Sequence, residues 1–335
     1  MTDTHIDDAN ANRLDASRKS RSLIAFGVRA GLGVGFLGLF LWLYGVGRIV
    51  QSLARERPIF FVATIALYLA GQVMSAYRWI LLARLSGLAG RAREYLTYYF
   101  IGMFTNLFVP GLIGGDAARA AYLGLRHRRM GEAVASVVAD RGVGLVALFW
   151  FAAVAAFTVT SVRLPSTMVK VAVAIGLLAL AGFLAAPILV TPLRRLRGRL
   201  GRIVRPLIPY CQNPLGLIIP FALSLLLQAS LAVCQYLLAL GMGLDVPLSA
   251  VMLVVPMANV AASLPVTFNG LGVREGAYLL LFGMAGVAHQ DAIALGLLWF
   301  SATLIGGLAG VVPFVMTPIP KPEDKLDLYV AAQGS

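Results

Sequence analysis

The chain has 335 residues, of which 59% are hydrophobic and only 13% are charged, and this composition excludes a soluble globular protein of that length. Apolar runs of about 20 residues recur along the chain, which predicts an all-α polytopic membrane protein. The net charge of +13 indicates arginine-rich cytoplasmic loops that face anionic lipid, so no nucleic-acid partner is expected.

The polar ends of the chain frame a single membrane domain at residues 22–317. Residues 1–21 are predicted to be a disordered cytoplasmic tail, and residues 318–335 a cytoplasmic C-terminal tail. The first apolar run lacks a small-residue cleavage site, which indicates a retained anchor. Six full spans are predicted, at residues 22–44, 58–82, 133–160, 169–190, 215–240 and 292–317.

An interrupted apolar segment lies between the second and third of these spans. It runs through residues 95–113, breaks at residues 110–115, where proline and glycine oppose a continuous helix, and continues through residues 116–126. If residues 95–113 crossed the membrane completely, the basic cluster at residues 119–129 would lie outside, against the positive-inside rule. We therefore predict a re-entrant hairpin that reaches half depth and returns.

A second interrupted segment, residues 247–287, repeats the spacing of the first. Few positive charges flank it, which suits a hairpin that enters from the outer side. The chain then divides into two inverted repeats, at about residues 22–160 and 166–317, each with two spans, a hairpin and a span. The shared pattern is P-x4-G-x3-R, formed by Pro110, Gly115 and Arg119 in the first copy and by Pro265, Gly270 and Arg274 in the second.

The distribution of positive charge sets the predicted orientation. Most of the lysines and arginines fall in the tails and in the loops between the second and third, and the fourth and fifth, spans. Cytoplasmic loops carry an excess of these residues, so both termini are predicted to be cytoplasmic in a multi-pass protein of the cell (inner) membrane.

Each break is predicted to begin a helix near the bilayer midplane. The first N–H groups of such a helix are unpaired and carry partial positive charge. Asp116 is placed to cap the first helix, Asn269 precedes the second, and Arg119 and Arg274 follow about one turn later. Two opposed helix N-termini with two arginines predict a site for an anion, most naturally a phosphate.

The small residues at the breaks allow two interpretations. Gly114, Gly115, Gly270 and Gly272 either let a headgroup approach the backbone closely or serve only to pack and kink the helices.

Several charged and polar residues also carry two interpretations each. Arg78, next to Trp79 as an interfacial anchor, either snorkels to the surface or lines a polar cavity. Asp140 and Arg141 form either a structural clamp, with Arg119 as the partner of Asp140, or a substrate or proton-relay site.

The second repeat offers a similar choice. Glu275 either pairs with Arg274 or carries protons. Asn106 and Asn259 precede the two breaks and either cap freed carbonyl groups or contact substrate.

No cofactor or metal is predicted. The histidines and the two cysteines are not spaced as a ligand set, and no G-x4-G-K-[ST] loop is present, so ATP is not expected to drive the protein directly.

Three motifs resemble the lysylphosphatidylglycerol synthase transmembrane-region family: P-G-x-x-G-G-D-x-x-R at residues 110–119, Asp140–Arg141, and L-P-x-T-x-N-G-x-G-x-R-E-G at residues 264–276. The resemblance covers nearly the whole apolar chain and implies a lipid flippase or translocator. Bifunctional members carry a soluble aminoacyltransferase domain after the membrane part, and this chain has no such domain before Ser335. The resemblance implies functional positions at Asp116, Arg119, Asp140, Arg141, Asn269, Arg274 and Glu275.

The sequence therefore predicts a non-enzymatic translocator of an anionic phospholipid or a polyprenyl-phosphate-linked lipid. Two alternatives stay open: a membrane-embedded transferase that uses a polyprenyl-phosphate sugar, and a non-transporting partner of a separate lipid-synthesising enzyme. No catalytic residue is assigned. The candidate substrate-binding residues are Arg78, Asn106, Gly114, Gly115, Asp116, Arg119, Asp140, Arg141, Asn259, Thr267, Asn269, Gly270, Gly272, Arg274 and Glu275.

Overall fold

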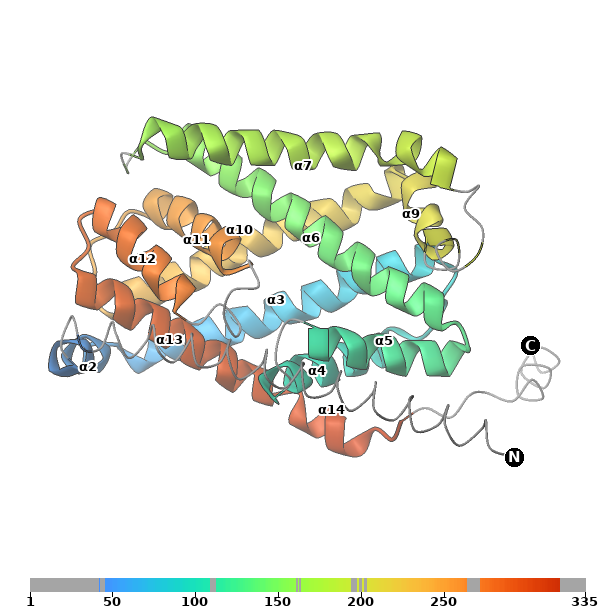
Figure 1. Ribbon diagram of the computed structural model, residues 1–335. Helices are drawn as coiled ribbons and strands as arrows, with labels where there is room; N and C mark the ends of the chain where they lie inside the picture. Colours follow the sequence, from blue (N-terminus) through green and yellow to red (C-terminus); the bar gives the residue numbers. More distant parts are fainter. Residues whose placement is uncertain are drawn as a thin grey trace, which may run out of the picture.

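The computed structural model shows a bundle of α-helices, and the part of the chain that it describes contains no strand (Figure 1). The described residues are 42, 46–108, 113–160, 162, 164–193, 198, 201, 204–263 and 272–319. The predicted all-α polytopic fold is confirmed.

Five helical segments are long and apolar enough to cross a membrane. They agree with five of the six predicted spans, and the remaining one, at residues 22–44, lies almost wholly outside the described residues. The five segments are α3 (Pro58–Leu85), α6 (Met130–Thr158), α7 (Ser166–Leu193), η2 (Leu215–Leu217) with α10 (Ile218–Gly241), and α13 (His289–Leu308) with α14 (Val311–Met316).

Each interrupted segment contains two shorter helices that pack against each other. The first pair is α4 (Ala92–Phe108) and α5 (Ile113–His127), and the second is α11 (Leu248–Ala262) and α12 (Val273–Met284). The longest of the four, α4, has 17 residues and a length of about 26 Å, which is less than a hydrocarbon core of about 30 Å. The re-entrant path and the inverted repeats stay predictions.

One predicted boundary is wrong. Helix α5 begins at Ile113, so Gly114 and Gly115 lie in its first turn and not in the break. The physical reason is close packing against α4, which a residue without a side chain permits. Residues 109–112 and 264–271, the core of the two breaks, lie outside the described part.

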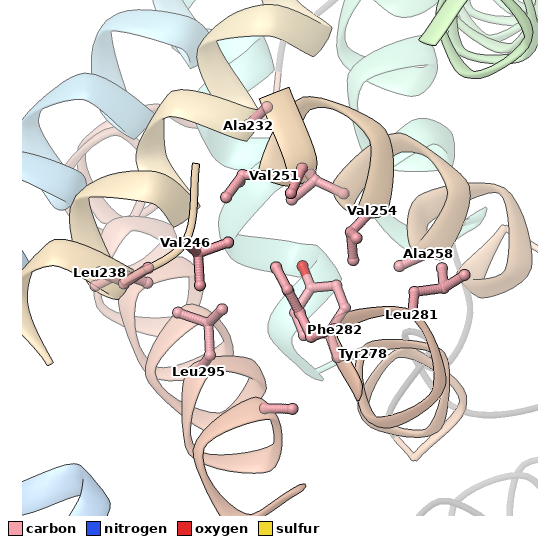
Figure 2. Packing of buried hydrophobic residues seen from close by; sticks show 14 of the residues in the cluster. Ala232, Leu238, Val246, Val251, Val254, Ala258, Tyr278, Leu281, Phe282 and Leu295 are labelled. Atoms are coloured by element: carbon pink, nitrogen blue, oxygen red, sulfur yellow. The ribbon is translucent and has the colours of Figure 1, made fainter. Parts of the chain in front are cut away.

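Three apolar cores pack the described part of the bundle, and the two largest lie one beside each interrupted segment. The larger core joins α10, α11, α12 and α13. Within it, Tyr278 and Phe282 of α12 point toward Val251 of α11 (Figure 2). The smaller of these two joins α3, α4, α5 and α6 around Trp79 and Tyr95, whose rings meet edge to face at 5.2 Å. Helix α6 contacts α3, α5, α10 and α11 and so connects the two halves.

Loops that were predicted to share one side of the membrane contact each other. On the predicted cytoplasmic side, the hydroxyl of Ser86 donates a hydrogen bond to the hydroxyl of Tyr210 in α9 (Ile208–Gln212), which follows η1 (Arg205–Leu207). On the other side, Arg55, after α2 (Val46–Ala54), forms an ion pair with Asp291 at the start of α13. These two contacts show which span ends lie together, and the orientation of the chain in the membrane stays a prediction.

We expect the loop between α2 and α3 to make the protein sensitive to pH. Both carboxylate oxygens of Glu56 are buried without a hydrogen-bond partner, the carboxylate lies against Gly241, and burial raises the pKa of Glu56 to about 7. A raised pKa stabilises the folded state at low pH, and this contribution is lost as the pH rises from about 4.5 to 7. The wild type should therefore lose thermal stability across this window, and Glu56→Gln should lose less, as measured by melting in detergent between pH 4.5 and 8. Equal slopes for the two proteins would contradict the expectation.

Candidate functional site

A network of ion pairs joins α3, α5 and α6 inside the bundle. We call it the first cluster, and it consists of Arg78, Asp116, Arg119, Asp140 and Arg141. Asp140 accepts from Nε of Arg78 at 2.8 Å and from Nη1 of Arg119 at 2.9 Å. Asp116 accepts from Nε of Arg119 at 3.1 Å and from Nε of Arg141 at 2.6 Å. The five side chains therefore form one continuous chain of charge-assisted hydrogen bonds.

The centre of the first cluster is buried, so an unpaired charge there would be costly. The side chains of Arg78, Arg119 and Asp140 are 8%, 4% and 3% exposed. Arg119 also lies over the rings of Trp79 and Tyr99, with its Cζ at 5.1 and 5.4 Å from the ring centroids. A buried ion pair must offset the desolvation of its charges, and for Arg119 the two carboxylates and the two ring faces together supply that compensation.

These contacts decide between several of the interpretations drawn from the sequence. Arg78 does not snorkel, because it donates to Asp140 and, at 2.9 Å, to the hydroxyl of Ser224 on α10. Trp79 is not an interfacial anchor: it is fully buried and donates to Ser136 at 3.1 Å. The predicted contact between Asp140 and Arg119 is confirmed.

The capping position predicted for Asp116 is wrong. Helix α5 starts three residues earlier, at Ile113, and both carboxylate oxygens of Asp116 bind arginines. Asn106 of α4 instead serves the start of α5, since its Oδ1 accepts from the N–H of Gly115 at 2.7 Å.

The first cluster carries one surplus positive charge, because three guanidinium groups meet two carboxylates. Arg141 is its outermost member, with a side chain that is 44% exposed. Arg141 lies about 12 Å along α6 from Ala133, where the predicted span begins, and about 26 Å from Thr158, which places it inside the predicted span, in the half nearer its predicted cytoplasmic end. An exposed arginine at this depth needs water or an anion beside it.

The glycines of the first interrupted segment have a packing role. A Cβ on Gly102 would lie 2.7 Å from the carbonyl oxygen of Gly115, and a Cβ on Gly115 would collide with Gly102 and with the Asn106 amide. Helices α4 and α5 cross at these two residues. For Gly115 the structure therefore supports the packing interpretation.

We expect Gly115→Ala to destabilise the protein by about 1–3 kcal/mol, the usual penalty for overpacking, because the added methyl group would push α5 away from α4. Gly142→Ala is the matched control, since a Cβ at Gly142 in α6 meets nothing within 4 Å. Melting temperatures in detergent test the difference. If both variants melt with the wild type, the close crossing of α4 and α5 is not required.

A second group of polar side chains lies between α10, α12 and α13. We call it the second cluster, and it consists of Gln235, Arg274, Glu275 and Tyr278. The hydroxyl of Tyr278 donates to Oε1 of Gln235, and Oε2 of Glu275 accepts from the N–H of Gly272 at 2.5 Å. Three atoms of this cluster are buried without a partner: Gln235 Nε2, Arg274 Nε and Glu275 Oε1.

Of the two interpretations of Glu275, the ion pair with Arg274 is not found among the described residues. Glu275 instead caps α12 by reaching back to Gly272, whose φ of 82° favours glycine.

The remaining predicted residues are placed in part. Asn259 lies half-buried in the last turn of α11, where its carbonyl accepts from Ser263 N–H at 2.9 Å, and Gly114 lies in the first turn of α5. Thr267, Asn269 and Gly270 lie outside the described residues. The direct meeting of Arg119 and Arg274 stays a prediction, and the structure shows Arg119 already engaged by two carboxylates.

The sequence patterns did not single out Gln235, Tyr278 or Ser224. Gln235 carried the clearest signal, since an amide in the middle of an apolar span needs a buried partner. Tyr278 and Ser224 are common in apolar helices, so only the structure reveals their partners.

The comparisons with known proteins agree with this architecture. The family model described as lysylphosphatidylglycerol synthase TM region matches residues 24–310. The chain is also similar to a UPF0104 membrane protein of Methanothermobacter thermautotrophicus, with 22% identity over 295 residues that cover 78% of this chain and 86% of the relative. No solved structure matches the chain.

Proposed function

The chain belongs to the lysylphosphatidylglycerol synthase transmembrane-region family, and from this we propose that it moves a phospholipid or another phosphate-linked lipid between the leaflets of its membrane. The headgroup passes between the two clusters at the level of the interrupted segments, while the apolar tail stays in the bilayer.

The observation that carries the proposal is the position of Arg141. It is a half-exposed guanidinium inside a predicted span, held at 2.6 Å by Asp116, in a cluster with one surplus positive charge. A charged side chain at this depth is expensive and marks a substrate or ion pathway in most membrane proteins. A phosphate would match both the surplus charge and the geometry of a guanidinium group.

In this proposal the two clusters have different roles. Asp140, Arg78 and Arg119 hold α3, α5 and α6 together and orient Asp116, which in turn orients Arg141 toward the phosphate. Arg274 of the second cluster, with its Nε unpartnered in the described structure, supplies the next phosphate contact. Rocking of one repeat against the other would open the path to each leaflet in turn.

Leaflet exchange in reconstituted vesicles tests the proposal. Vesicles with the purified full chain and a trace of headgroup-labelled fluorescent phosphatidylglycerol are treated with a membrane-impermeant reductant. Protein-free vesicles protect the inner-leaflet probe, and vesicles with the protein are expected to expose it. Protection equal to that of protein-free vesicles, with this probe and with a polyprenyl-phosphate probe, would remove the translocator proposal.

A further inference from the structure

The second cluster has a donor and acceptor pattern that is incomplete in a specific way. Nε2 of Gln235 and Nε of Arg274 are donors without an acceptor, and Oε1 of Glu275 is an acceptor without a donor. Gln235, Glu275 and Tyr278 are all fully buried. A buried polar atom without a partner costs about 1–3 kcal/mol, so three in one group indicate a site that a ligand completes.

The residues that carry the three atoms are linked through Tyr278. On α12, Arg274 lies four residues and Glu275 three residues before Tyr278, so each of the two side chains neighbours Tyr278 on the helix. This part of α12 meets α13, because a Cβ on Gly296 would lie 3.4 Å from Oε1 of Glu275 and 3.5 Å from Cδ2 of Tyr278. It meets α10 through the hydrogen bond from Tyr278 to Gln235.

Tyr278 fixes the orientation of the Gln235 amide. Its hydroxyl donates to Oε1, which leaves the two N–H groups of Gln235 for another acceptor. Oε2 of Glu275 is likewise held by Gly272 N–H, which leaves Oε1 for a donor. The free groups are thus set by contacts within the protein.

We propose that the second cluster selects a phosphate headgroup that also carries a hydrogen-bond donor, either a hydroxyl or an ammonium group. Arg274 and Gln235 bind the phosphate oxygens, and Glu275 accepts from the donor beside the phosphate. This inference rests on the proposed lipid-binding function and names the class of headgroup at the same site. A headgroup that lacks the donor leaves Oε1 of Glu275 buried and unpaired, which is the strongest basis for rejection that a site can have.

Two matched lipid pairs test the selection. The first pair is dihexanoyl phosphatidylglycerol and dihexanoyl phosphatidylmethanol, which have the same charge and differ in their hydroxyl donors. The second pair is dihexanoyl phosphatidylethanolamine and dihexanoyl phosphatidylcholine, which differ in their ammonium N–H donors. Their affinities for the full chain in detergent are measured by tryptophan fluorescence. The donor-bearing member of at least one pair is expected to bind about tenfold more tightly, and the pair that shows the difference identifies the donor.

Variants separate selection from a purely structural role. Glu275→Gln keeps an oxygen for Gly272 N–H but places an N–H group where the ligand donor should sit, so it should reduce the tenfold preference to less than about twofold. Gln235→Met should weaken binding of all four lipids while keeping the preference. Cys234→Ala, next to Gln235 but directed at Thr64, is the control and should bind like the wild type.

Equal affinities within both pairs, or an unchanged preference in Glu275→Gln, would overturn the selection even if leaflet exchange is observed. Selective binding without exchange would support the selection and contradict the transport proposal.

Discussion

Asp140→Asn is expected to destabilise the protein by about 3–5 kcal/mol and to abolish lipid exchange. Asp140 is the common partner of Arg78 and Arg119, at 2.8 and 2.9 Å, and all three side chains are buried. Removing the carboxylate leaves Arg78 buried without a counter-charge and leaves Arg119 with Asp116 alone, and breaking a buried pair from one side has this magnitude. Unfolding in bicelles, together with the vesicle assay, measures both effects.

A matched control and a compensating variant complete this test. Glu132→Gln removes another carboxylate of α6, which pairs with Arg129 at the surface at 3.0 Å, and should cost less than about 1 kcal/mol. The double variant Asp140→Asn with Arg119→Gln removes one charge of each sign and should recover part of the stability but not the exchange. If Asp140→Asn unfolds within about 1 kcal/mol of the wild type, the first cluster does not hold the bundle together.

Arg274→Gln is expected to lower lipid exchange by about tenfold to a hundredfold while changing the unfolding free energy by less than about 1 kcal/mol. The contrast with Asp140 follows from the contacts. Nε of Arg274 is buried without a partner in the described structure, and its neighbour Glu275 binds Gly272 instead, so the substitution breaks no ion pair. Its effect should fall on the ligand.

Lys170→Gln is the charge-matched control, since it removes one positive charge from the exposed start of α7, away from both clusters. It should leave the rate of exchange and the unfolding free energy unchanged. A large loss of stability in Arg274→Gln, or a loss of exchange equal to that of Lys170→Gln, would show that Arg274 is not a ligand contact.

The spans could be predicted from the sequence because apolar length alone determines them. The bounds of α3, α6, α10 and α13 with α14 follow the predicted spans within a few residues, and the positions of the two interrupted segments follow the prolines and glycines. The charged residues of the first cluster could also be identified from the sequence as candidate site residues, since intramembrane charges are rare and costly.

Local signals failed where long-range partners decide the outcome. Arg78 and Trp79 lie near the end of a span and resemble interfacial anchors, but their partners are Asp140 and Ser136, more than 50 residues away. Gly114 and Gly115 resemble a helix break, but Gly102 of α4 requires a glycine at the crossing with α5. No local pattern contains these contacts.

The most direct test of a phosphate passage is a cryo-electron microscopy map of the full chain in nanodiscs made of a lipid that it exchanges. We predict a phosphate-sized density within hydrogen-bonding distance of the guanidinium groups of Arg141 and Arg274, about halfway across the bilayer, continuous with acyl density that leads out of the bundle. A map in which both guanidinium groups face only protein or acyl chains, with all phosphates at the membrane surfaces, would contradict a headgroup path between the two clusters.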